Sequence, residues 1–205
     1  PPPASAAENR AMPAGAPQPP HAQTSAPAPA AAPAKTGYAN VDGARIYYQV
    51  HGDLGGGRTP LLVLHGAFMS GDAMAPLIAP LAASRPVIAI DARGHGRTRD
   101  APGGLSYDRM AHDAAGVLAA LKVEKADVLG YSMGAATALR LAMLHPERIG
   151  KQVIISGAYR LDGMPPELIK NIASLTPEIF AGSPIESGYK KLSPTPDAFP
   201  TLVNE

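Results

Sequence analysis

The sequence contains no cysteine and no apolar run long enough to cross a membrane, and its charges nearly balance. Without cysteine there can be no disulfide framework, no thiolate metal cluster and no thiol nucleophile. A transmembrane helix needs about 18 or more apolar residues in a row, so no membrane span is expected. The 18 basic and 17 acidic residues form no block of either sign, which leaves nothing to bind a nucleic-acid backbone. We therefore expect no nucleic-acid partner, no metal and no other cofactor.

Proline and alanine dominate the start of the chain and occupy 23 of the first 36 positions. Residues 1–36 have almost no branched aliphatic side chains to bury, so we expect them to form a disordered tether. They lack the apolar stretch of a signal peptide. Because a tether of this composition often follows an export signal, the sequence favours an exported protein over a cytoplasmic one. The remaining residues are enough for one folded domain.

Short apolar runs alternate with helical patterns between residues 60 and 156. The runs predict strands that are buried on both faces, at 60–65, 86–91, 126–131 and 152–156. The helical patterns lie between them, at 74–81, 106–121 and 133–144. A strand or hairpin with an Asp-Gly turn is expected at 38–51. The alternation predicts an α/β fold, with a mostly parallel sheet and helices on both of its faces.

The alternation stops after residue 160, where prolines interrupt the chain repeatedly. We therefore assign 37–160 to the core and expect 161–205 to begin a helical cap or lid, with a first helix opening at Pro165-Pro166. Its apolar residues suggest a largely apolar pocket: Met164, Ile169, Ile172, Leu175, Ile179 and Phe180. The expected partner is a small apolar acyl or ester substrate. The oligomeric state does not follow from the sequence.

The strongest chemical motif is Gly130-Tyr131-Ser132-Met133-Gly134, between a predicted strand and an alanine-rich helix. In that context the pattern indicates a nucleophile elbow, a turn sharp enough to expose Ser132 Oγ. Such a turn strains the backbone at the serine and requires positions almost free of side chain two residues before and after it. Glycine meets this demand at both. The competing interpretation, a serine that only caps a helix, is less favoured because of the strand that leads in.

A second loop is expected at the same edge of the sheet, since the carboxyl ends of parallel strands meet there. Residues 65–68 follow the first buried strand. The backbone N–H of Ala67, or of Phe68 if the register differs by one, would join the N–H of Met133 in an oxyanion hole. His65 is interpreted as a structural support for this loop, because it precedes the nucleophile in the chain.

Three motifs in this order resemble the α/β-hydrolase fold superfamily: His65-Gly66-Ala67, Asp91-Ala92-Arg93-Gly94-His95-Gly96 and the elbow at 130–134. Within it, the chain is most similar to serine esterases, enol-lactonases and cofactor-free perhydrolases. The resemblance covers about residues 38–160. It implies that Ser132 is the nucleophile and that Asp91, Arg93 and His95 belong to the scaffold. It also implies a triad in the order serine, acid, histidine, with the histidine after the last strand.

The chain departs from this pattern because it offers no suitable base. The only histidine after Ser132 is His145, which a helix rising about 1.5 Å per residue would place roughly 18–20 Å away. Asp162 and Asp197 are unconvincing as the acid. We therefore expect the fold to be C-terminally incomplete, with the acid and histidine beyond residue 205, and the 205-residue chain itself to be inactive.

The sequence thus predicts a serine hydrolase of carboxylic esters, lactones or related acyl compounds that works through an acyl-enzyme on Ser132. A serine at the elbow argues against haloalkane dehalogenase and epoxide hydrolase chemistry. Two alternatives stay open. The chain could be a non-catalytic binding protein or an inactive fragment on the hydrolase fold. A narrower alternative is a cofactor-free perhydrolase or haloperoxidase, which uses the same triad.

Overall fold

The computed structural model describes residues 32–100 and 103–205. Most of the predicted tether, residues 1–31, lies outside the described residues. The first strand begins at Lys35, two residues ahead of the predicted domain boundary. No helix in the described part of the chain is both long and apolar enough to cross a bilayer.

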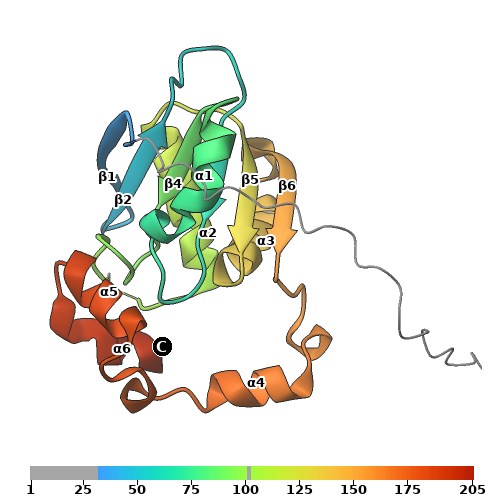
Figure 1. The fold of residues 1–205 in the computed structure, drawn as a ribbon. Helices are drawn as coiled ribbons and strands as arrows, with labels where there is room; N and C mark the ends of the chain where they lie inside the picture. Colours follow the sequence, from blue (N-terminus) through green and yellow to red (C-terminus); the bar gives the residue numbers. More distant parts are fainter. Residues whose placement is uncertain (1–31, 101–102) are drawn as a thin grey trace, which may run out of the picture.

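The described strands form a six-stranded sheet in the order β1-β2-β4-β3-β5-β6 (Figure 1). Their bounds are β1 (Lys35–Val41), β2 (Ala44–His51), β3 (Leu61–Leu64), β4 (Val87–Ile90), β5 (Ala126–Tyr131) and β6 (Ile149–Ile155). Strands β3 to β6 run parallel, and β1 and β2 are antiparallel to their neighbours. The predicted α/β class with a mostly parallel sheet is confirmed.

The first two strands form the predicted hairpin, in which Val41 pairs with Ala44. The two residues between them, Asp42 and Gly43, have φ angles of 45° and 81°. Positive φ at both central positions is the geometry of a type I′ turn, whose twist matches that of the flanking strands. The Asp-Gly pair therefore sets the register of this edge of the sheet.

Helices cover both faces of the sheet. The helices are α1 (Ala75–Ala82), α2 (Tyr107–Ala120), α3 (Met133–Leu144), α4 (Pro166–Ala173), α5 (Pro184–Leu192) and α6 (Phe199–Asn204). Short 3₁₀ helices are η1 (Gly71–Met74), η2 (Pro146–Arg148), η3 (Leu161–Gly163), η4 (Pro177–Phe180) and η5 (Pro196–Ala198). Helices α2 and α3 share one hydrophobic core with the sheet, and α1 packs on the opposite face. Helix α2 starts where Ser106 Oγ accepts a hydrogen bond from the backbone N–H of Arg109.

The last strand differs from its prediction. It begins at Ile149 rather than at residue 152, and it lies at the edge of the described sheet. Helix α3 covers one side of it, where Gln152 Nε2 donates to Ala138 O. Val153 is 51% exposed. The expectation of a strand buried on both faces is therefore wrong for the described chain, because α3 covers only one face of β6 and Val153 lies on the other.

The cap divides into a docked part and a part that stands away from the core. Helices η4, α5 and α6 contribute to a third hydrophobic cluster, which packs on Phe68 and Leu105 of the core. Helix α4 buries none of its residues, and Figure 1 shows it apart from the sheet. Ile172 and Ile179, expected to line a pocket, are 51% and 58% exposed.

A buried ion pair fixes the loop after β4 to helix α2. Arg93 donates to both carboxylate oxygens of Asp113 at 2.8 and 2.9 Å, and both side chains are 3% exposed. Replacing Asp113 with alanine leaves the arginine charge buried without its partner. We expect the free energy of unfolding to fall by about 3–5 kcal/mol in a urea titration.

The matched control is the ion pair between Asp108 of α2 and Arg140 of α3, which also joins two elements but is exposed to solvent. Asp108→Ala should leave the unfolding transition unchanged within error, because exposed ion pairs contribute little. Equal losses in the two variants would contradict the assignment of the Arg93–Asp113 pair as a structural element.

Candidate active site

Ser132 sits between β5 and α3 in a strained backbone. Its φ and ψ angles are 52° and −115°, a region that costs a residue other than glycine roughly 1–3 kcal/mol. The residue is exposed, and its backbone N–H donates to Ile155 O at 2.9 Å. This is the shape of a nucleophile elbow, as the motif predicts. The chemical role of the serine stays a prediction.

The two glycines of the motif are required by close packing. A Cβ atom on Gly130 would lie 2.7 Å from Ala135 Cα, and one on Gly134 would lie 2.6 Å from His65 O. Real Cβ atoms do not approach this closely. The predicted need for positions without side chains on both sides of the serine agrees with this geometry.

The loop after β3 forms a tight turn against the elbow. Met69 N–H donates to Gly66 O at 3.3 Å and closes the turn, and Ala67 at its tip is exposed. A Cβ on Gly66 would lie 3.0 Å from the ring of Tyr131, so the turn touches the residue before the serine. Met133 is the first residue of α3, where backbone N–H groups have no partner within the helix. The predicted oxyanion donors thus come to the same edge of the sheet.

His65 links the loops that follow β3 and β4. Its Nε2 accepts from the backbone N–H of Ala92 at 3.0 Å, so the proton is on Nδ1, which lies 2.7 Å from Gly66 O. Burial lowers the pKa of His65 to about 4, and the ring is neutral at physiological pH. Both nitrogens are engaged in the scaffold, which agrees with the structural role predicted for this residue.

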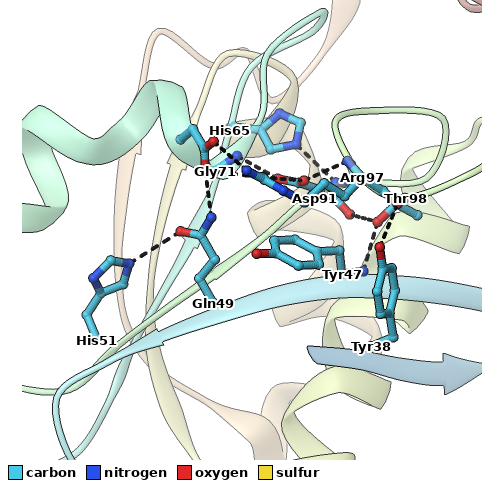
Figure 2. A network of polar contacts seen from close by, with 11 residues as sticks. Tyr38, Tyr47, Gln49, His51, His65, Gly71, Asp91, Arg97 and Thr98 are labelled. Atoms are coloured by element: carbon cyan, nitrogen blue, oxygen red, sulfur yellow. Dashed lines mark hydrogen bonds and ion pairs between the residues drawn. The ribbon is translucent and has the colours of Figure 1, made fainter. Parts of the chain in front are cut away.

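Asp91 also connects the segments that follow β3 and β4 (Figure 2). Its carboxylate accepts from the backbone N–H groups of Gly71 and Arg97 at 2.7 and 2.8 Å. Its carbonyl accepts from Thr98 Oγ1 at 2.7 Å, which in turn accepts from Tyr47 N–H at 2.9 Å. Burial raises the pKa of Asp91, opposed by these hydrogen bonds. Asp91 is a scaffold residue, as the resemblance implied.

A polar pocket between β2 and α1 was not foreseen from the sequence. It has a volume of about 300 Å³ and is lined in part by Tyr47, Gln49, His51, Asp72 and Arg97. Gln49 Nε2 donates to Asp72 Oδ1 at 2.6 Å, and His51 lies beside Gln49 Oε1 (Figure 2). The signal in the sequence was the period of two in β2, which puts these polar residues on one face. None of the elbow residues lines this pocket.

No histidine in the described part of the chain reaches the serine. His145 ends α3 and lies 2.9 Å from His112 at the exposed surface. His65 and His95 are buried and bond to backbone groups. Among the described residues, Ser132 Oγ has no hydrogen bond to a histidine or a carboxylate. A cavity of only about 10 Å³ is lined by Met133 and Gly134 of the elbow together with His65.

Phenylalanines of the cap cover the turn beside the elbow. The Phe68 ring centroid is 5.1 Å from that of Phe180 and 6.2 Å from that of Phe199. Phe68 itself has a φ of 61°, an outlier for a bulky residue. The sequence pointed to Phe68 only as an alternative oxyanion donor. Its contact with the cap joins residues more than a hundred positions apart, which no local pattern predicts.

Comparison with known proteins gives the same fold. A putative carbamate hydrolase, RutD, from Caulobacter segnis is 41% identical over 124 residues, which are 60% of this chain and 46% of that protein. The structure of Est816, described as an N-acyl homoserine lactone degrading enzyme, superposes with a TM-score of 0.63 at 29% identity, covering 82% of this chain and 69% of Est816. The enol-lactonase from Burkholderia xenovorans LB400 gives 0.60 at 26% identity, covering 75% and 56%.

The chain spans a little under half the length of the curated carbamate hydrolases it matches. The match to the alpha/beta hydrolase fold family extends over residues 59–200 and includes the β3 turn, the elbow and most of the cap. The chain therefore belongs to the alpha/beta hydrolase fold family.

Proposed function

We propose that Ser132 is the nucleophile of a serine hydrolase that acts on carboxylic esters, lactones or related acyl compounds. The observation that carries this proposal is the exposed serine in a strained backbone at the β5–α3 turn. Strain of this kind persists only where the surrounding structure holds it, and it gathers at functional sites. Here the packing around Gly130 and Gly134 holds it.

In the proposed reaction Ser132 Oγ attacks the carbonyl carbon of the substrate. The N–H groups of Ala67 and Met133 donate hydrogen bonds to the oxyanion, and the positive end of α3 favours the same charge. The C–O or C–N bond to the leaving group then breaks, and water hydrolyses the acyl-enzyme. A histidine oriented by an acid, supplied elsewhere in the whole protein, takes the serine proton and passes it to the leaving group.

The proposed substrate class is supported by the names of the relatives. They are a carbamate hydrolase, a protein that degrades acyl homoserine lactones and an enol-lactonase. All three names refer to a substrate class in which an acyl carbon is bonded to oxygen or nitrogen. The partly exposed ring of Phe68 beside the turn favours a small apolar acyl group. This mechanism calls for no metal and no cofactor.

The test is covalent capture of the serine. The protein as translated from its gene should react with an alkyl fluorophosphonate, and peptide mass spectrometry should place the adduct on Ser132. The control is Ser156→Ala, because Ser156 is also exposed, has a φ of 53° and directly follows the neighbouring strand β6. That variant should label like the unsubstituted protein. An adduct on Ser156, or none on Ser132, would contradict the proposal.

A further inference from the structure

Phe68 occupies a turn position that ordinarily requires glycine. It is the third residue of the turn that runs from Gly66 to Met69, and its φ is 61°. A turn with a positive φ at this position favours glycine or asparagine, because a larger side chain is strained there. A phenylalanine keeps this conformation only if other contacts hold it.

Those contacts come from the cap. Phe68 packs on Phe180 of η4 at an interplanar angle of 54° and on Phe199 of α6 at 63°. Phe180 and Phe199 also pack on each other, with centroids 5.8 Å apart. Phe199 is 1% exposed and Phe180 8%. These residues, here called the phenylalanine cluster, are all the phenylalanines of the chain.

The backbone conformation and the ring position at Phe68 depend on each other. The direction of the Cα–Cβ bond is fixed by the backbone, so a change to negative φ would carry the ring out of the phenylalanine cluster. The same change would reorient the peptide bond between Ala67 and Phe68. That peptide carries the Phe68 N–H, the alternative oxyanion donor of this turn, so the cap stabilises one orientation of this N–H beside Ala67.

We propose that Phe68 is a positioning residue through which the cap holds the oxyanion turn in its working geometry. The inference rests on the proposed function in one respect, the use of a backbone N–H of this turn, that of Ala67 or of Phe68, as an oxyanion donor. It gives Phe180 and Phe199 an effect on the rate of the chemical step, although neither residue would contact the substrate. A merely structural alternative is that the Phe68 ring only forms a wall of the substrate pocket.

Two substitutions of Phe68 separate these roles. Phe68→Ala removes the ring and keeps the strain, whereas Phe68→Gly removes the ring and the strain together. We expect Phe68→Ala to lower kcat for an aryl ester about tenfold with little change in KM, because a displaced donor weakens the transition state. Phe68→Gly should lose clearly less kcat than Phe68→Ala. A pocket wall would instead make both variants equal and raise KM in both.

A second measurement tests whether the cap holds the turn, and it needs no catalytic activity. Amide hydrogen exchange of Met69, read by NMR in the 205-residue chain, reports on the hydrogen bond that closes the turn. We expect exchange to accelerate about tenfold in Phe68→Ala and in Phe180→Ala, and less in Phe68→Gly. The control is Tyr189→Leu, because Tyr189 joins the cluster through Phe199. That control should leave Met69 exchange unchanged.

The outcomes distinguish this inference from the proposed function. Equal exchange in the alanine and glycine variants of Phe68, or acceleration of Met69 exchange by Tyr189→Leu as large as by Phe180→Ala, would overturn the positioning role. The exchange can follow the expected order while kcat is the same in both Phe68 variants. In that case the cap holds the turn but the turn does not serve the oxyanion, and the positioning proposal fails. If the unsubstituted whole protein hydrolyses no ester, the proposed function fails, and the exchange data alone decide whether the cap holds the turn.

Discussion

Replacing Ser132 with alanine is expected to lower kcat for ester hydrolysis by the whole protein at least about a thousandfold. The acyl-enzyme cannot form without the hydroxyl, and the oxyanion donors can then assist only the slow direct attack of water. The unfolding temperature should hardly change, because the side chain is exposed and makes no packing contact that alanine would lose. The measurement is steady-state hydrolysis of a short-chain aryl ester beside thermal unfolding.

The matched variant for this experiment is Ser132→Gly. Glycine takes a φ of 52° without strain, so this variant should unfold at a higher temperature than Ser132→Ala while being equally inactive. The pair separates the chemistry of the hydroxyl from the strain of the elbow. Robust turnover in either variant, with contaminating esterases removed, would mean that another residue is the nucleophile.

Acidification is expected to destabilise the fold through two buried histidines. Burial lowers the pKa of His65 to about 4 and, together with the nearby His65 ring, lowers that of His95 to about 4. In the unfolded chain both rings take up a proton near pH 6.5, whereas in the folded state they stay neutral until about pH 4. The free energy of unfolding should therefore fall between pH 6.5 and 4 by up to about 1.4 kcal/mol per pH unit for each histidine.

Buried carboxyls oppose this trend in the lower part of the window. Burial raises the pKa of Asp91 and of Asp113, so on acidification the folded state takes up these protons before the unfolded state does. The histidine contribution is isolated by His95→Asn, whose amide can still donate to Arg93 O in place of Nδ1. Urea titrations from neutral pH down to about 4.5 should show a shallower slope for this variant. An unchanged slope would contradict the role given to His95.

The core was predictable because its signals are local. The helix after the elbow spans Met133–Leu144 as predicted, since a buried strand, a glycine-rich turn and an alanine-rich amphipathic stretch follow one another directly. The Asp-Gly hairpin turn was predictable for the same reason. The shape of the elbow followed from the chemistry that the motif requires, and the structure shows it without testing the role of Ser132.

The features that escaped prediction depend on contacts between distant parts of the chain. Arg93 and Asp113 are separated by twenty positions, and no local sequence pattern around either residue predicts that they form an ion pair. The exposed face of β6 depends on which helices pack against the sheet there rather than on its apolar composition. The left-handed backbone of Phe68 depends on two cap residues that a local pattern cannot associate with it.

Helix α4 has a consequence for how this protein changes over evolutionary time. Because none of its residues is fully buried and only Ile169 is half-buried, most substitutions there disturb little packing, while the phenylalanine cluster further along the chain keeps the rest of the cap in place. Residues 166–173 are therefore free to diverge faster than any other helix of the described chain. Substitutions can accumulate in this segment of the described chain with little loss of stability that selection would have to repair.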